Sequence, residues 1–352
     1  MSLREISNSE IAELLARKAE SSQNILQRAY RKAARCAFLW PVHASALHRD
    51  GIPLSNLNGV GPFIAERLRR WLDNPPARKA IAPALRRDFI ALADARTLLQ
   101  REPMWPRSLR GDSQMHTHWS DGSGSLAEMA AAAAARNYDY IAITDHSKGL
   151  KIAGGIDEKR LAQQGREIDA LNRRHTHSTV TLLRSIEMNL SPRGEGDMKP
   201  SALARLDVVL GSFHSSLRTT DDQTERYLAA LRNPTIQILG HPRGRIYNFR
   251  IGLRADWARV FAEAARLDKA VEIDCYPDRQ DLNLTLLRIA RREGVRISLG
   301  TDAHHPPQLD FIELGLAAAL QAKIPPERMI NFLSLAELLT WVKHVRRASQ
   351  TR

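Results

Sequence analysis

The sequence has few cysteines and no long apolar run. Its two cysteines among 352 residues, Cys36 and Cys275, lie in different regions and match no Cys-x-x-Cys pattern. No apolar run approaches the roughly 20 residues of a membrane-spanning helix, and residues 1–10 lack the apolar core of a signal peptide. These absences predict a soluble protein of the reducing cytoplasm, with no membrane partner.

Acidic residues are also scarce relative to basic ones. The chain has 39 Asp and Glu against 52 Lys and Arg, for a net charge of +13. This excess favours a polyanionic partner, with nucleic acid first. The alternative is an arginine-rich composition that only solvates the surface. The length predicts one large domain with a smaller one beside it.

Residues 9–38 have the apolar spacing of two helices, with Ser9 as the expected N-terminal cap. The second predicted helix, residues 25–39, is basic and carries Arg28, Arg31 and Lys32. A run of positive charge on a helix is often only a solvated face.

The next helical pattern, residues 54–68, is interrupted at Gly59 and Gly61 and resumes at Pro62, a good first helical position. Backbone N–H groups of such a glycine turn and helix N-terminus can bind a nucleic-acid phosphate. The alternative is a plain pair of helices joined by a glycine turn. Residues 1–76 are therefore expected to be a small helical domain. Residues 77–110 are expected to be a basic helical connector that breaks at residues 103–106.

From residue 111 onward, strand-like and helix-like segments alternate. The predicted strands are residues 113–118, 140–144, 181–188, 207–213, 235–239, 270–275 and 295–301. The predicted helices between them are residues 126–136, 158–174, 201–205, 223–232, 255–266 and 282–293, and the tail from 314 to 345 is helical, with a last helix pair opening at Pro325 and Pro326. Seven such units in residues 111–352 predict a closed or nearly closed parallel barrel of the α/β class.

The first of these strands leads into a candidate metal-binding stretch. His116 and His118 alternate, so they can face one point, and Asp121 follows closely. Imidazole and carboxylate are usual ligands of Zn²⁺, Mn²⁺ and Fe²⁺. A His-x-His pair alone can equally be a solvated strand end, so the rest of the chain has to decide.

Polar residues recur where the later strands end. They are Asp145, His146, Glu187, His214, His241, Asp302 and His304. In a parallel barrel these ends converge on one face, where barrel enzymes place their sites. Any single one can be a structural histidine. Six histidines and several carboxylates on one rim, however, require cations for electrostatic balance, so the pattern predicts a multimetal site.

The order and spacing of these residues resemble the polymerase and histidinol phosphatase (PHP) family of metal-dependent phosphoesterases, in the version found at the C-terminus of bacterial family-X DNA polymerases. The matching residues are Gly111, Asp112, Gln114, Met115, His116, Ser120, Asp121, Gly122, residues 141–147, Glu187, residues 212–215, residues 240–242, Gly244, Arg245, Asp278, Arg279, Asp281, Leu282 and residues 301–304. Residues 28–34 and 59–62 resemble the small helix-hairpin-helix DNA-binding domain of the same polymerases.

The resemblance implies a distorted (β/α)7 TIM-like barrel that holds three divalent ions, Zn, Mn or Fe. One ion would be held by His116, Glu187 and Asp302, with Gln114 at the position of a further ligand. Glu187 would bridge to a second ion held by His214 and His241. The third would be held by Asp121, His146 and His304.

Catalysis and substrate binding follow from the same resemblance. Closely spaced cations lower the pKa of a bridging water, so that hydroxide attacks the phosphoryl group in line. The residues implied in catalysis are His116, Glu187, Asp302 and Arg245. Those implied in binding the substrate are Ser147, Lys148, Arg243, Arg245 and Arg279, the arginines through paired N–H donors. Gly59, Gly61, Arg28, Arg31 and Lys32 are implied in binding DNA.

Two features depart from the family pattern. The family begins its site with His-x-His, but this chain has Gln114-x-His116, which leaves open whether Gln114 or His118 completes the first metal site. Residues 77–110 also leave no room for a polymerase palm, so polymerase activity is not expected.

The leading hypothesis is a phosphoesterase that acts on DNA ends, as a 3′–5′ exonuclease or 3′-phosphatase in DNA repair. One alternative is a small-molecule phosphatase of the histidinol-phosphatase type. Another is a DNA-binding protein with weak or no catalysis.

Overall fold

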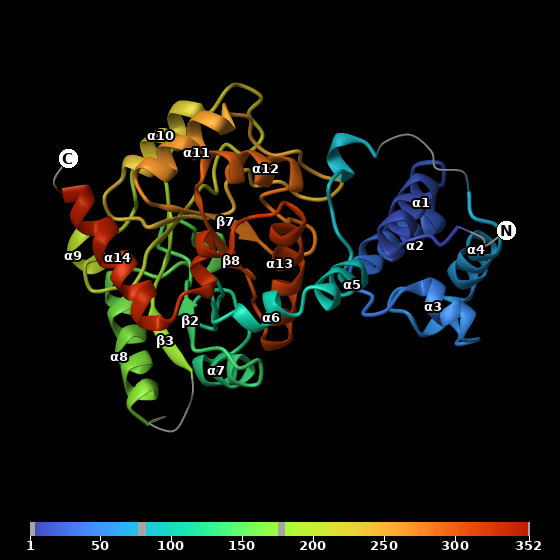
Figure 1. Ribbon diagram of the computed structural model, residues 1–352, viewed down its shortest axis with the longest axis horizontal. Coiled ribbons are helices and arrows are strands. Elements are labelled where there is room, and N and C mark those ends of the chain that lie inside the picture. The colour runs from blue at the N-terminus through green and yellow to red at the C-terminus, as the bar shows by residue number, and fades with distance from the viewer. Residues whose placement is uncertain (1–3, 77–81, 175–179, 351–352) are drawn as a thin grey trace. The chain divides into compact units, whose positions relative to one another are not determined.

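The computed structural model describes residues 4–76, 82–174 and 180–350, which fall into two compact units (Figure 1). Unit 1 consists of Met1–Pro103 and Tyr247–Phe249, and unit 2 of Met104–Ile246 and Arg250–Arg352. The expected divisions of the chain after residues 76 and 110 stay predictions, and residues 77–81 lie outside the described residues.

Unit 1 is helical. Its elements are α1 (Asn8–Glu20), α2 (Asn24–Ala37), α3 (Ala44–Arg49), the 3-10 turns η1 (Leu54–Asn56) and η2 (Ala84–Arg86), α4 (Pro62–Asp73) and α5 (Leu92–Arg101). The predicted cap at Ser9 is wrong. Ser7 and Glu10 form a capping box at the start of α1, while Ser9 lies inside the helix and its Oγ donates to Asp94 at 2.6 Å.

The glycine turn before α4 packs against α2. Gly59 has a φ of +76°, and a Cβ there would lie 2.7 Å from Cys36 Sγ, so both backbone conformation and space require glycine. Gly61 precedes Pro62, the first residue of α4, as expected from the sequence. The segment before the turn is the short η1 rather than the predicted α-helix. A helix-hairpin-helix domain therefore stays a prediction.

The predicted helical connector, residues 77–110, is helical over α5 but irregular over most of residues 82–91. Between residues 82 and 91 only η2 is helical, and there Arg86 is buried in ion pairs with Glu13 and Glu20. A second helix, α6 (Met104–Ser108), forms where a break was expected. Pro106 is its third residue, and the first turn of a helix tolerates proline because its N–H groups need no intrahelical partner.

Unit 2 contains two parallel sheets. The strands are β1 (Gly111–Asp112), β2 (Tyr140–Ile143), β3 (Thr181–Arg184), β4 (Glu187–Asn189), β5 (Leu210–Ser212), β6 (Ile238–Leu239), β7 (Ala270–Asp274) and β8 (Arg296–Gly300). The sheet orders are β1-β2-β3 and β4-β5-β6-β7-β8. Parallel bridges pair His146 with Glu187 and Met115 with Ala303 at the edges of these sheets. The α/β class with parallel strands is thus confirmed, whereas a closed barrel stays a prediction.

The observed strands have other bounds than predicted, and the first and third differ most. The first ends at Asp112 rather than running through residues 113–118, because side chains accept hydrogen bonds from two of the N–H groups that a regular strand would donate to its neighbours. Gln114 N donates to Asp112 Oδ1 at 3.1 Å, and Met115 N donates to Thr144 Oγ1 at 2.9 Å. The third is divided into β3 and β4.

Helices lie around the strands of unit 2 (Figure 1). They are α7 (Leu126–Ala134), α8 (Glu158–Arg174), α9 (Pro200–Leu203), α10 (Thr224–Arg232), α11 (Trp257–Arg266), α12 (Leu284–Glu293), α13 (Ile312–Gln321) and α14 (Leu335–Gln350). Pro325 and Pro326 do not open a helix pair. Two 3-10 turns, Pro326–Arg328 and Ile330–Phe332, lead instead into α14 alone. Across the described ranges, no helix is both long and apolar enough to span a bilayer.

Candidate metal centre

The carboxyl ends of the unit 2 strands bring eight of the nine predicted metal ligands into one linked cluster. They are His116, Asp121, His146, Glu187, His214, His241, Asp302 and His304. Parallel strands end at the same edge of a sheet, so residues far apart in the sequence meet there. The ninth, Gln114, faces elsewhere.

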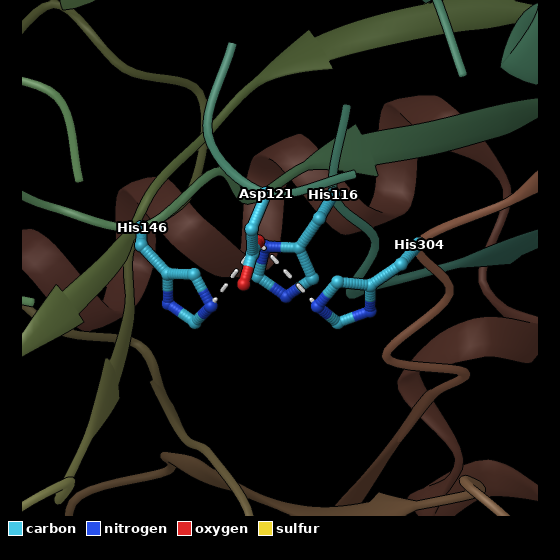
Figure 2. Close-up of side chains that lie close together, drawn as sticks. All are labelled: His116, Asp121, His146 and His304. Carbon is cyan, nitrogen blue, oxygen red and sulfur yellow. Dashed lines mark ion pairs between the residues drawn. The ribbon is translucent and has the colours of Figure 1, made fainter. Parts of the chain in front are cut away.

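Asp121 lies between two imidazoles. His146 Nε2 is 3.6 Å and His304 Nε2 is 3.5 Å from Asp121 Oδ1, and Figure 2 shows the two rings on either side of the carboxylate. The His116 ring stacks on His146, with centroids 4.3 Å apart. One donor atom from each of these four residues lies within 4.8 Å of the others, close enough to surround one cation.

Glu187 is the centre of a second group. Its Oε1 accepts from His241 Nε2 at 2.6 Å and lies 3.2 Å from His214 Nε2. Its Oε2 lies 2.8 Å from His146 Nδ1. Glu187, His146 and His214 also meet the geometric condition for sharing one ion.

Unsatisfied polar atoms show that this donor set suits metal ions. Glu187 Oε2, His146 Nδ1 and His116 Nδ1 are buried, and none has a hydrogen bond of acceptable geometry among the described residues. Buried polar atoms normally have partners, and their absence costs free energy. Imidazole nitrogens and carboxylate oxygens with free lone pairs are the ligands that Zn²⁺, Mn²⁺ and Fe²⁺ bind, so the residues fit divalent ions.

The charges in this cluster shift one another's pKa. Burial alone would raise the pKa of Glu187, but the imidazoles of His214, His146 and His241 hold it well below its usual range. Burial lowers the pKa of His241, yet the Glu187 carboxylate outweighs this and raises it to about 10. For His116, burial and then the neighbouring His146 lower the pKa. The lowered pKa favours the ionised form of Glu187, which is the form that binds cations.

Asp302 is held on both oxygens. Its Oδ1 lies 2.9 Å from His116 Nε2, and its Oδ2 accepts from Arg279 Nη1 at 2.6 Å. Burial would raise the pKa of Asp302, but the Arg279 guanidinium, followed by His116, keeps it far below its usual range. Arg279 therefore contacts a predicted metal ligand directly.

Gln114 and His118 both lie outside the two groups. Gln114 is fully buried, and in the amide orientation that satisfies its hydrogen bonds it donates to both oxygens of Glu272, at 2.9 Å for Oε2. His118 is exposed, and its ring centroid lies 6.2 Å from that of Trp119. His116 and His118 therefore do not face one point as predicted, because residues 116–118 do not form a strand.

The predicted substrate residues divide into two places. Arg245 is buried and its Nε donates to the Arg279 carbonyl at 2.7 Å, while Arg243 N donates to Asp281 Oδ2 at 2.8 Å. Arg245 thus contacts Arg279, which itself contacts Asp302.

Ser147 and Lys148 follow His146 but already have acidic partners. Ser147 Oγ donates to Asp197 at 2.7 Å, and the Lys148 ammonium lies 2.7 Å from Glu158. Their predicted role in binding substrate stays a prediction.

The predicted DNA-binding residues all lie in unit 1. Arg28, Arg31 and Lys32 are exposed on α2, and their spacing puts them on one face of that helix.

Sequence reasoning missed Glu272 and Asp274, which are fully buried at the carboxyl end of β7. The alternation of Glu272 and Asp274 with apolar neighbours in residues 270–275 was a usable signal, because alternate strand residues share a face. Asp145, which ends the second predicted strand, has a structural role that the sequence pattern does not indicate. Its Oδ1 accepts from Thr117 N at 2.8 Å and thus holds the loop that carries Asp121.

Comparison with known proteins identifies the relatives of this chain. No protein-family model matches it. It is 36% identical over 236 residues, 67% of its length, to "DNA polymerase/3'-5' exonuclease PolX" of Bacillus subtilis, and it spans 41% of that protein. The chain belongs to the PHP family. Within that family it is related to PolX and, at 26% identity over 62% of its length, to a "Probable phosphatase" of Caldicellulosiruptor bescii, of which it covers 89%.

A solved PHP-fold structure is also similar to the chain. Histidinol phosphate phosphatase of Lactococcus lactis, complexed with zinc, L-histidinol and phosphate, matches with a TM-score of 0.44 and 18% identity, over 60% of this chain and 93% of that one.

Proposed function

We propose that this chain is a metal-dependent phosphoesterase that acts on DNA ends, as a 3′–5′ exonuclease or 3′-phosphatase in DNA repair. The observation that carries the proposal is the convergence of five histidines with the carboxylates of Asp121, Glu187 and Asp302, with buried lone pairs left unsatisfied. The relation to a protein named a polymerase and 3′–5′ exonuclease supports DNA as the substrate.

The side chains have distinct tasks in this proposal. Glu187 with His214 and His241 would hold one ion, and Asp121 with His146 and His304 another. His116 adjoins both groups, and Asp302 contacts His116. Bound divalent ions would supply an activated water and withdraw charge from the phosphoryl oxygens. The number of ions, which the resemblance puts at three, stays a prediction, as does their identity.

Arg243, Arg245 and Arg279 would bind the phosphate. Arg245, beside Arg279, would be the main contact in catalysis, and the guanidinium groups of Arg243 and Arg279 offer paired N–H donors for phosphoryl oxygens. Ser147 and Lys148 would contact another part of the substrate.

Unit 1 would bind the DNA backbone through Arg28, Arg31, Lys32 and the N–H groups near Gly59 and Gly61. The proposal also includes a closed seven-stranded barrel for unit 2, with β3 and β4 as one interrupted strand. The parallel bridges at His146–Glu187 and Met115–Ala303 support this closure.

Hydrolysis of a 3′-recessed DNA duplex in the presence of Mn²⁺ tests the proposal. We expect turnover that an excess of chelator abolishes and that Glu187→Gln reduces by more than about 100-fold, since loss of a metal ligand costs at least as much as loss of its supporting residues. The matched control is Glu327→Gln, which alters an exposed glutamate of η5 (Pro326–Arg328). Full turnover with chelator present would contradict the metal-dependent reaction.

The second candidate is a small-molecule phosphatase of the histidinol-phosphatase type. It is favoured by the match to a probable phosphatase, of which the chain covers 89%. A panel of 3′-hydroxyl DNA, 3′-phosphate DNA and histidinol phosphate separates the two functions. Turnover of histidinol phosphate without turnover of either DNA would favour this second function. If the protein binds metal but turns over none of these substrates, the result favours a DNA-binding protein without catalysis.

A further inference from the structure

Gln114 pairs with a buried carboxylate beside the metal centre. Both oxygens of the buried Glu272 carboxylate accept from the Gln114 amide, and Glu272 Oε2 also accepts from His241 N at 2.7 Å. A Cβ at Gly300 would clash with both Gln114 and Glu272. The absence of a side chain at Gly300 thus leaves room for the Gln114–Glu272 pair, whose hydrogen bonds occupy the Gln114 amide.

The guanidinium of Arg279 is a cation of the protein itself, and it lies against Asp302, a predicted metal ligand. Arg279 Nη1 lies 2.6 Å from Asp302 Oδ2 and 3.7 Å from the buried Asp274 Oδ2. A metal ion bound to the same Asp302 oxygen would lie within a few ångströms of the guanidinium, and like charges at that distance repel strongly in a partly buried site. Arg279 also offsets one negative charge of this carboxylate pair, so less positive charge is required from a metal ion.

In the part of the chain that the structure describes, the groups around Asp121 and Glu187 have no such cation from the protein. The group of His116, Asp121, His146 and His304 contains only imidazoles and one carboxylate, as does the group of His146, Glu187 and His214. No lysine or arginine lies within ion-pair distance of Asp121 or Glu187 among the described residues. Their carboxylates therefore remain available for metal ions.

We propose that the centre holds two divalent ions, with the Arg279–Asp302 and Gln114–Glu272 pairs in the place of a third. This inference rests on the proposed metal-dependent function and deepens it. One ion belongs to Asp121, His146 and His304, and the other to Glu187, His214 and His241. The Arg279 guanidinium supplies, without a metal, part of the positive charge that a phosphoryl group meets.

Metal content of the full-length protein tests the inference. The protein is stripped with chelator, reloaded with excess Mn²⁺ or Zn²⁺, desalted, and analysed by mass spectrometry for metal per chain. We expect two ions in the wild type and one in His304→Ala. Asp302→Asn is expected to keep two, and asparagine tolerates the positive φ of +52° at this position. Three ions in the wild type, or loss of one in Asp302→Asn, would overturn the inference.

A gain-of-metal variant tests the same idea in the opposite direction. The double variant Gln114→His with Arg279→Met supplies an imidazole and removes the guanidinium, and we expect it to bind a third ion. If circular dichroism shows that the double variant does not fold, the wild type and Asp302→Asn still decide the question.

Failure of the inference and failure of the proposed function give different results. Two bound ions without hydrolysis of DNA ends would overturn the function and support the inference. Three bound ions with metal-dependent hydrolysis would overturn the inference alone. Fewer than two ions in the reloaded wild type would overturn the inference and count against the function.

Discussion

Lys269 shows how burial changes the chemistry of a single residue. Its side chain is 1% exposed, and its Nζ donates to the Asn233 carbonyl at 2.6 Å. Burial lowers the pKa of Lys269 to about 7, whereas a lysine in an unfolded chain titrates near 10.4. Between these values the unfolded chain binds more protons than the folded one. The free energy of unfolding should therefore rise with pH in this window, by up to roughly 1.4 kcal/mol per pH unit from this residue.

Replacing Lys269 by methionine should remove that part of the pH dependence. We expect Lys269→Met to be more stable than the wild type at pH 7, with the difference shrinking towards pH 9. Denaturant unfolding at several pH values measures it. Lys343→Met, at an exposed position of α14, serves as the matched control and should keep the wild-type slope. If the free energy of unfolding has the same slope against pH in both variants, Lys269 is protonated in the folded protein.

At the scale of elements, the loop between β1 and α7 depends on one carboxylate. Asp145 accepts from Thr117 N at 2.8 Å, from Ser120 N at 3.2 Å and from Gln164 Nε2 at 2.6 Å. This loop carries Asp121 to its histidines. Asp145 is therefore a positioning residue that acts through the loop.

The change Asp145→Asn should weaken metal binding although no ligand is altered, because an amide cannot accept all these hydrogen bonds. We expect the affinity for Mn²⁺ or Zn²⁺ to fall by about 10-fold or more, the range seen when residues that support metal ligands are changed. Calorimetric titration of the stripped protein measures it. Asp50→Asn, an exposed change in unit 1, should leave affinity unaltered, and an unaltered affinity in Asp145→Asn would refute the positioning role.

Helix α7 begins with a capping box, in which the Ser125 side chain accepts from Glu128 N and Glu128 bonds back to Ser125 N. Ser125→Ala should lower the free energy of unfolding by about 1 kcal/mol, since it leaves a first-turn N–H without its partner. Thermal or denaturant unfolding tests this. Ser201→Ala, inside the short helix α9 and exposed, should cost nothing measurable. A loss of equal size in both variants would mean that the cap contributes no stability.

At the scale of the whole molecule, the net charge of +13 predicts salt-dependent binding to DNA. Replacing Arg28, Arg31 and Lys32 together by alanine should lower the slope of log affinity against log salt by about 1 for each lost phosphate contact. Binding of duplex DNA over a range of salt concentrations measures it.

The matched control replaces Arg288, Arg291 and Arg292, which have the same spacing and exposure on α12. If that variant lowers the affinity and the salt slope as much as the first, DNA binding depends on the net charge of the protein and not on the face of α2.

Part of the candidate site could be read from the sequence because its residues follow apolar runs at regular intervals. His146, Glu187, His241 and Asp302 each end such a run, and parallel strands carry their ends to one edge. The conformation of residues 113–118 could not be predicted in this way, because it depends on local hydrogen bonds to side chains. Asp112 and Thr144 draw the backbone of residues 114 and 115 out of a regular strand, and no apolar pattern records that.

By itself, the sequence determined the alternation of strands and helices, the parallel α/β class and the set of histidines and carboxylates that meet, because these depend on periodicity and order along the chain. Only the tertiary structure decided which acidic group each polar side chain contacts. Gln114 faces Glu272, and Arg279 faces Asp302, across sequence distances that no local pattern spans. Such pairings depend on the three-dimensional packing of β7 and β8 beside the segment after β1, where burial makes each unsatisfied charge costly.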